Sequence, residues 1–175
     1  MRFNRAASRI DTRAQTITDE DGTQVVYDQL ISSIPLDLLV DLAQLDHLRD
    51  SADLLQYSTV HIVGVGLNGS CGPDLEGKCW MYFPESNCPF YRVTVFSHYS
   101  PNNVPDINRQ WSLMAEVSQS PVKPVNRSTV VEEAIEGMLQ TGLIEDRNQV
   151  HHTWHHELTR GYPTPGLRRD ESLGK

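Results

Sequence analysis

Hydrophobic and polar residues alternate in the first part of this chain of 175 residues, and turn-forming residues interrupt the alternation. Between residues 9 and 34 this pattern predicts short strands, with a hairpin turn at Asp21 and Gly22. Residues 30–34 are mostly apolar and predict a further strand that ends before Pro35, a residue suited to the first turn of a helix. Leucines then recur at steps of three and four residues. They predict an amphipathic helix with an apolar face formed by Leu38, Leu39, Leu42, Leu45 and Leu48.

The spacing changes near Tyr57, where short strand-like segments follow one another with Gly, Pro, Asn and Asp between them. The predicted strands are residues 58–65, 78–83, 90–96 and 110–117. One helix interrupts this series, because Thr129 and Glu132 fit a capping box and apolar residues follow at helical spacing. Gly142 suits the left-handed conformation at the end of that helix. Residues 143–158 then predict extended structure.

This order of elements predicts an α/β (α+β) protein in two parts. Residues 1–56 have the pattern of part of a nucleotide-binding α/β domain. Residues 57–167 predict a mainly antiparallel sheet with one packed helix, and residues 168–175 predict a loose, charged tail.

Composition and charge restrict the partners that we expect. The net charge is −8 without a basic cluster, which argues against nucleic acid or an anionic membrane surface as a partner. No apolar run approaches the roughly 20 residues needed to cross a bilayer. The first residues also lack the apolar segment of a signal peptide, so we expect a cytoplasmic protein. Cys71, Cys79 and Cys88 are an odd number without C-x-x-C spacing, and we interpret them as reduced thiols.

Two motifs are of types found in ligand sites, but the residues around them favour a structural role without a ligand. Residues 64–69 match G-x-G-x-x-G after an apolar strand, yet Gly72 and Pro73 follow too soon for the helix that a dinucleotide site requires. The run HHTWHH from His151 to His156 lies in a segment that predicts a strand. Histidines four residues apart on a strand are too far apart to chelate one metal ion, so we expect no metal site and a core position for Trp154.

The strongest candidate for chemistry is an aromatic cluster with one arginine. Residues 78–103 hold seven of the 13 aromatic residues of the chain, and Arg92 is their only arginine. Such a set suits a pocket that stacks a flat ring and clamps an anion, although a sheet core with a solvated arginine has the same composition. Trp80 and Tyr82 share one face of their strand because side chains alternate. We predict that Tyr82 lies opposite Arg92, which places Arg92 on that same face.

The segment WMYFPESNCPFYRVTVFSHYSPNN, from Trp80 to Asn103, resembles the matching part of eukaryotic, fungal-type UDP-galactopyranose mutases. The run GYPTP from Gly161 to Pro165 recurs in the same family in the same order. The segment YDQLISSIPLDLL after the Asp21–Gly22 turn is similar to the interior of the flavin domain of the broader amine oxidase-like group. Together these segments cover nearly the whole chain.

The resemblance implies a flavoprotein isomerase that interconverts UDP-galactopyranose and UDP-galactofuranose for cell wall biosynthesis. In this family reduced FAD attacks the anomeric carbon through its N5 atom, so the flavin supplies the nucleophile and no side chain does. The fold implied is part of a FAD-binding Rossmann-like domain (residues 1–56) followed by a substrate domain (residues 57–167). The family also allows a homo-oligomer.

The same resemblance implies particular site residues. Arg92 matches one of two arginines that hold the substrate diphosphate, and an arginine suits that role because its planar fork stays charged. Trp80 and Tyr82 match residues that border the sugar and the diphosphate, and Tyr162 matches a tyrosine whose hydroxyl reaches the diphosphate. Further substrate-binding candidates are Tyr99 and Asn102. Ala7 falls near a position whose backbone meets the adenine end of FAD in related flavoproteins.

The chain also departs from the family pattern. Members begin with a Rossmann fingerprint, a histidine-bearing loop and a second diphosphate arginine, and they end with a further glycine-rich FAD segment, none of which is recognisable here. We therefore expect an internal piece of the enzyme that binds FAD poorly and has no mutase activity alone. Two alternatives stay open: an amine oxidase-like flavin oxidoreductase, and a non-catalytic remnant that keeps some affinity for UDP-sugars.

Overall fold

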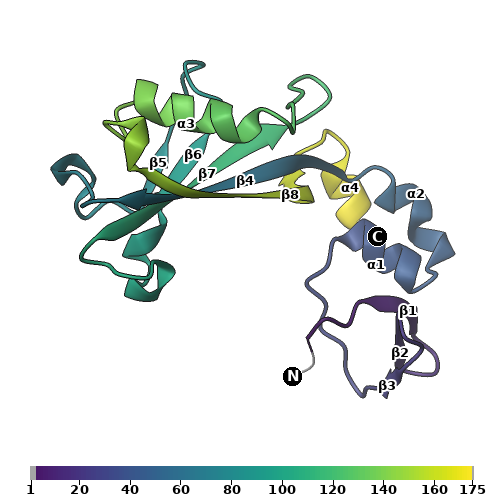
Figure 1. Ribbon diagram of the computed structural model, residues 1–175. Helices are drawn as coiled ribbons and strands as arrows, with labels where there is room; N and C mark the ends of the chain where they lie inside the picture. Colours follow the sequence, from purple (N-terminus) through teal and green to yellow (C-terminus); the bar gives the residue numbers. More distant parts are fainter. Residues whose placement is uncertain (1–2, 175) are drawn as a thin grey trace. The chain divides into compact units, whose positions relative to one another are not determined.

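A computed structural model describes residues 3–174 of the chain (Figure 1). The contacts between residues divide them into two compact units. One unit combines the described residues up to Tyr57 with those from Pro163 onward, and the other unit is Ser58–Tyr162. The assignment of residues 1–56 to a FAD-binding domain and of 57–167 to a substrate domain stays a prediction.

The first unit contains a small antiparallel sheet followed by short helices. Strands β1 (Ala7–Asp11), β2 (Thr16–Asp19) and β3 (Gln24–Val26) pair in that order. The predicted turn at Gly22 is confirmed, with a φ of 79° that glycine adopts without strain. The helices are α1 (Leu36–Leu42), the 3₁₀ turn Asp46–Leu48, α2 (Arg49–Ala52) and α4 (Arg169–Leu173).

Three predictions for this unit are wrong. Residues 30–34 form no strand, because no neighbouring strand of the described chain pairs with them. The leucine-rich helix is broken after Leu42, since Gln44 takes a left-handed conformation with a φ of 52° and the chain restarts as α2. The tail after Leu167 contains α4 and buries Ser172, so these residues are ordered by packing that their charged sequence did not indicate.

The second unit is built on a five-stranded sheet in the order β5-β6-β7-β4-β8. Its strands are β4 (Gln56–Asn68), β5 (Trp80–Tyr82), β6 (Arg92–Val95), β7 (Gln110–Gln119) and β8 (Val150–Thr164). The pairs β5–β6, β6–β7 and β4–β7 are antiparallel. Gly66 lies against His152 and Val60 against Gly161, so β8 also runs antiparallel to β4. The predicted mainly antiparallel sheet is therefore confirmed.

Helix α3 (Val130–Gln140) covers one face of this sheet (Figure 1). We call this the covered face. Alternate residues of β4, β6 and β7 form the buried core on this face, including Val63, Val93 and Leu113, which are at most 1% exposed. Apolar burial of this kind is the main stabilising contribution to the unit. The opposite side, which we call the open face, carries the alternate residues of the same strands.

The ends of α3 agree only in part with the caps predicted from the sequence. Gly142 has the expected positive φ, 71°. The prediction of a capping box is wrong, because the Thr129 side chain accepts no hydrogen bond from a backbone N–H of the helix. Its hydroxyl instead donates a hydrogen bond of 2.6 Å to the Glu133 carboxylate. Thr129 already has a helical backbone conformation, with φ −118° and ψ −13°, so its side chain does not reach back over the first turn.

The G-x-G-x-x-G run is a strand end, as its surroundings indicated. Residues up to Asn68 belong to β4, and Gly69 makes the turn that follows with a φ of 96°. The next regular element is the 3₁₀ turn Pro73–Leu75 and not a helix that could hold a pyrophosphate. Among the described residues, no helix is both long and apolar enough to cross a membrane.

Candidate functional site on the open face

The cluster around Arg92 forms as the sequence predicted. Tyr82 lies opposite Arg92 and Trp80 lies opposite Thr94 in the β5–β6 pair, so these four side chains share the open face. The guanidinium carbon of Arg92 lies 5.3 Å from the ring centre of Trp80 and 6.0 Å from that of Tyr82. Both rings are more than half exposed, Trp80 at 56% and Tyr82 at 62%. A cation beside exposed aromatic rings is more typical of a ligand-binding surface than of a core.

Arg92 is also held by a carboxylate on the neighbouring strand. Glu116 on β7 lies opposite Arg92, and its side chain is only 7% exposed. The Nε and Nη2 atoms of Arg92 donate hydrogen bonds of 2.7 and 2.8 Å to the two oxygens of Glu116. The Tyr91 hydroxyl donates a third bond of 2.6 Å to Glu116. Two parallel bonds of this kind fix the guanidinium plane and join β6 to β7.

These contacts set the charges of the group. Burial of Arg92 disfavours its charged form and by itself would lower its pKa. The hydrogen bonds with Tyr82 and Glu116, together with the negative charge of Glu116, are stronger effects, so the pKa of Arg92 is raised. Burial, together with the hydrogen bond to Glu116, raises the pKa of Tyr91. Arg92 is therefore always a cation, and Tyr91 stays a neutral hydrogen-bond donor.

The structure places the other predicted residues at different distances from this cluster. Tyr99 joins it directly, because the indole N–H of Trp80 donates to the Tyr99 hydroxyl. Tyr162 is exposed at the end of β8, within electrostatic range of Tyr91. Asn102 is exposed in the 3₁₀ turn Pro101–Asn103, where its backbone N–H bonds the Ser100 hydroxyl. Ala7 is the exposed first residue of β1, in the other unit.

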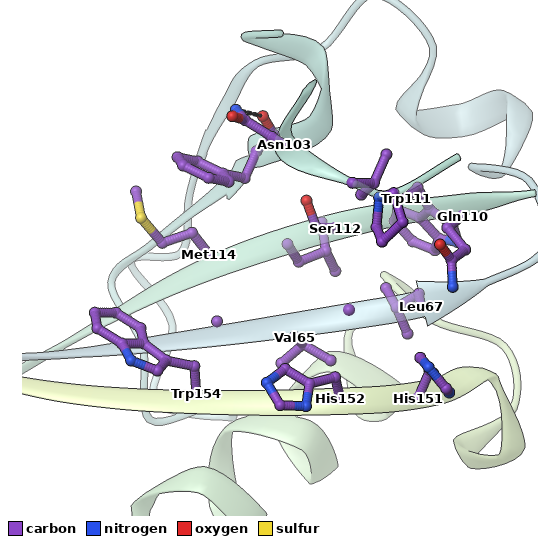
Figure 2. A pocket seen from close by; sticks show the side chains of 16 residues that line it. Val65, Leu67, Asn103, Gln110, Trp111, Ser112, Met114, His151, His152 and Trp154 are labelled. Atoms are coloured by element: carbon purple, nitrogen blue, oxygen red, sulfur yellow. Dashed lines mark hydrogen bonds between the residues drawn. The ribbon is translucent and has the colours of Figure 1, made fainter. Parts of the chain in front are cut away.

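A pocket of about 430 Å³ opens on the same face (Figure 2). One of its lining residues, Met114, lies opposite Thr94 of the strand that carries Arg92. Gly64 and Gly66 of β4 form its floor, where the absence of side chains leaves room above the sheet. Figure 2 shows Met114 and Ser112 of β7 on the same side of the sheet as Trp154 of β8. The loop after β6 completes the wall with Phe96, Asn103, Val104 and Pro105. The lining is mostly apolar and aromatic, as in sites that bind flat rings.

Two buried hydroxyls on this face have no hydrogen-bond partner among the described residues. Thr94 is 1% exposed and Ser112 is 8% exposed, and neither side-chain oxygen is bonded. Thr94 lies opposite Trp80 and Met114, and Ser112 lies opposite Gly66 in the pocket floor. An unpaired buried hydroxyl is costly unless a ligand or water satisfies it. Both atoms therefore favour a polar ligand on the open face.

The histidine run lies on β8 as an extended segment, as predicted. His155 stacks on the completely buried His61 with ring centres 5.2 Å apart, and His61 also contacts the Gln119 side-chain oxygen at 2.6 Å. No group of three His, Cys, Asp or Glu side chains suited to a metal ion occurs among the described residues. The expected core position of Trp154 is wrong, because its ring is 53% exposed over Gly64. The cysteines are free thiols, as predicted.

Sequence reasoning missed Glu116, Tyr91 and the pocket residues. Glu116 left one signal, since it is the single charged residue within the apolar strand β7 and therefore needs a partner. Nothing local indicated that this partner is Arg92, 24 residues earlier. Gly64 and Trp154 lie on strands that meet only in the folded sheet.

Comparison with known proteins agrees with the sequence resemblance. No family model matches the chain. A solved structure of a reduced UDP-galactopyranose mutase is 42% identical with a TM-score of 0.83, and the match covers 97% of this chain and 37% of that one. The chain thus spans little more than a third of that mutase. The predicted similarity to UDP-galactopyranose mutases is confirmed over nearly the whole of this chain.

Two more distant structures share the fold alone. A protein of Pyrococcus furiosus is 13% identical with a TM-score of 0.63, covering 91% of this chain and 38% of that one. A candidate protoporphyrinogen oxidase from an Exiguobacterium species is 15% identical with a TM-score of 0.64, covering 97% and 37%. Both likenesses extend across the two units of the chain but carry no information about its ligand.

Proposed function

We propose that this chain is part of a UDP-galactopyranose mutase and forms one wall of its UDP-sugar site. The observation that carries the proposal is the convergence of Trp80, Tyr82 and Arg92 on the open face of the sheet. The 42% identity to a reduced UDP-galactopyranose mutase supports the substrate class. The alternative of an amine oxidase is disfavoured, because an amine substrate has no use for a permanent cation flanked by tyrosine hydroxyls.

In this proposal Arg92 holds the substrate diphosphate. Its Nε and Nη2 atoms are engaged by Glu116, so the Nη1 edge is the one directed away from the carboxylate. A phosphate oxygen at that edge would make a charge-assisted hydrogen bond. The hydroxyls of Tyr82 and Tyr162 are the neighbouring donors, and both side chains are exposed. These groups would stabilise both the bound diphosphate and the departing diphosphate, which gains a negative charge, and this is an electrostatic role.

The sugar would lie beside the diphosphate, over Trp80. An indole ring packs well against the apolar face of a hexose, and the hydrogen bond to Tyr99 fixes the orientation of the Trp80 ring. Adjacent strands are about 4.8 Å apart, so the pocket floor on β4 is about 10 Å from the strand of Arg92. A single sugar nucleotide spans that distance. Asn102 is the weakest of the proposed substrate contacts, because its side chain lines neither the pocket nor the Arg92 cluster.

The open face suits a reduced FAD ring, whereas the described residues offer little for the rest of that cofactor. The glycine floor, the apolar lining and the unpaired Ser112 hydroxyl match a flat ring with a polar edge. No glycine-rich turn that leads into a helix is present in residues 3–174 to hold the pyrophosphate. When bound, reduced FAD supplies the nucleophilic nitrogen of the reaction. Gly64, Gly66, Ser112 and Trp154 are the residues of this chain that we propose beside its ring. For Ala7, the contact with the adenine end of FAD stays a proposal from the family resemblance alone.

The proposal includes the wider properties that the family resemblance implies. The complete protein is a cytoplasmic flavoenzyme that acts on UDP-galactopyranose and UDP-galactofuranose and forms a homo-oligomer. We propose that the chain of 175 residues does not interconvert these sugars, since one wall cannot position the flavin and the sugar together. Turnover of UDP-galactofuranose by this chain with FAD and dithionite would contradict that statement.

Calorimetric titration with UDP tests the proposal without the flavin. The wild-type chain should bind UDP, and Arg92→Ala should weaken binding by about tenfold or more because a charge-assisted contact is lost. Arg127→Ala is the matched control, since Arg127 also pairs with a glutamate, Glu157, but lies outside the proposed site. Equal affinities of the wild type and Arg92→Ala would overturn the proposed site.

A further inference from the structure

Arg92 differs from a simple anion-binding arginine because its charge is already matched by a carboxylate. Glu116 is almost completely buried and accepts hydrogen bonds from Arg92 and from Tyr91. It has no other cation beside it, since the only salt bridge of Glu116 among the described residues is the one with Arg92. The carboxylate therefore offsets part of the positive charge that Arg92 presents to an anion.

The pairing geometry suggests what the carboxylate contributes. Glu116 binds the guanidinium side-on, through Nε and Nη2. Aromatic rings flank the same guanidinium, with the ring centre of Trp80 at 5.3 Å and that of Tyr91 at 5.9 Å. An arginine side chain has four rotatable bonds, and here one edge and the surrounding rings fix its terminal group. The guanidinium therefore offers a ligand only the edge that points away from Glu116.

We infer that Glu116 is a positioning residue that sets the specificity of the Arg92 site for an extended diphosphate ligand over simple anions. This inference rests on the proposed function and deepens it. The negative charge of Glu116 lowers the attraction of Arg92 for any anion. A ligand must therefore gain the rest of its affinity from contacts beyond Arg92, such as Tyr82, Trp80 and the pocket. A nucleoside diphosphate sugar can make those contacts, whereas inorganic phosphate or pyrophosphate cannot.

The substitution Glu116→Gln keeps the shape of the side chain and removes its charge. We expect the affinity for inorganic pyrophosphate to rise by about five- to tenfold, because a like charge near the bound anion is removed. The affinity for UDP should stay the same or fall, because the guanidinium is no longer held in one orientation. The ratio of UDP affinity to pyrophosphate affinity should thus fall by about fivefold or more. Titrations of the full chain by calorimetry measure both ligands.

Controls separate this role from a general effect of charge. Glu157→Gln removes a carboxylate that pairs with Arg127 and should leave both affinities unchanged. The double variant Arg92→Ala with Glu116→Gln should lose the gain in pyrophosphate affinity. The inference is overturned if Glu116→Gln does not tighten pyrophosphate binding, or if the double variant retains the gain. A failure of the wild-type chain to bind UDP would count against the proposed function, and the pyrophosphate titrations would still decide the role of Glu116.

A measurement on the wild-type chain keeps the inference testable if Glu116→Gln does not fold. In a nitrogen–proton correlation spectrum the Nε–H of Arg92 should exchange slowly with water, since it is bonded to a buried carboxylate. Addition of pyrophosphate should leave this signal in place, because the ligand binds at the other edge. Displacement of the signal by pyrophosphate, or rapid exchange without it, would show that Glu116 does not hold Arg92 and would overturn the inference.

Discussion

The two faces of the five-stranded sheet are made from the same strands but serve different purposes. On the covered face, alternate residues such as Val63, Val93 and Leu113 pack against α3 with almost no exposed surface. On the open face, the alternate positions include Arg92 and two exposed aromatic residues beside its guanidinium, Trp80 and Tyr82. If the proposed site is correct, a strand contributes to stability and to binding through neighbouring positions, and substitutions one residue apart should have different effects.

Each face also contains an exception. The open face buries one charged residue, Glu116, which is satisfied by Arg92 and Tyr91. His61 lies opposite Val117 on the covered side of the sheet and is completely buried, with His155 and Gln119 as its partners. The side chains of Glu116 and His61 are thus buried with hydrogen-bond partners that neighbouring strands supply. The two networks join strands that are distant in sequence.

The largest effect should come from the covered face. Phe90 is fully buried, packs edge-on against Phe83 with ring centres 5.0 Å apart and lies under Gly137 of α3. Phe90→Ala should lower the free energy of unfolding by about 3–5 kcal/mol, because it leaves a cavity under the helix. Urea unfolding measures the change, and Val122→Ala at a fully exposed position should change it by less than about 0.5 kcal/mol. A small loss for Phe90→Ala would show that α3 does not hold the covered face together.

A smaller loss should follow when β8 is pushed away from β4, which would disturb both faces. A Cβ atom at Gly161 would lie 2.7 Å from Val60 side-chain atoms and 2.9 Å from its backbone nitrogen. Gly161→Ala should therefore cost about 1–3 kcal/mol of unfolding free energy through overpacking. Gly72→Ala is the control, since a Cβ there meets nothing within 4 Å. Equal stability of the two variants in urea would contradict the close contact between β4 and β8.

The open face should respond in affinity rather than in stability. Trp80→Ala should weaken UDP binding by about fivefold, since the Trp80 ring helps to hold the Arg92 guanidinium in place for the diphosphate and such a contact contributes about 1 kcal/mol. Its unfolding free energy should change by less than about 1 kcal/mol because the ring is mostly exposed. Trp80→Phe keeps a ring but loses the hydrogen bond to Tyr99, so its affinity should be intermediate. A large loss of stability with unchanged UDP affinity would reverse the assignment of this face.

The smallest effect should be a dependence of stability on pH from the covered-side histidines. Burial, then the neighbouring His61 and Arg127, lowers the pKa of His155 below its ordinary value of 6.5. The unfolded chain therefore takes up a proton near pH 6.5 that the folded chain resists, so stability should fall as the pH drops from 6.5 towards the lowered pKa. His155→Gln should show a shallower fall than the wild type in urea unfolding at a series of pH values. Identical pH profiles would mean that His155 titrates alike in both states.

Much of the second unit could be predicted because its signals are local. Alternation placed the strands, and the β-strand period put Trp80, Tyr82 and Arg92 on one face once Tyr82 was assigned opposite Arg92. Predictions failed where longer-range packing overrode a local pattern. The leucines after Pro35 fit one helix, but Gln44 breaks it, and residues 30–34 have strand composition without a described neighbour to pair with. Trp154 was expected in the core because large rings usually are buried.

The sequence by itself determined the similarity to UDP-galactopyranose mutases and the strand period that puts Trp80 and Tyr82 on one face. The register that brings Tyr82 opposite Arg92 was one of two that the sequence allowed, and the structure confirms it. Only the tertiary structure decided that Glu116 neutralises Arg92 and that Gly64, Ser112 and Trp154 enclose a pocket on the same face. The physical reason is the range of the interactions. Side-chain alternation is a property of a single strand, whereas a buried ion pair and a pocket depend on which strands become neighbours in the sheet.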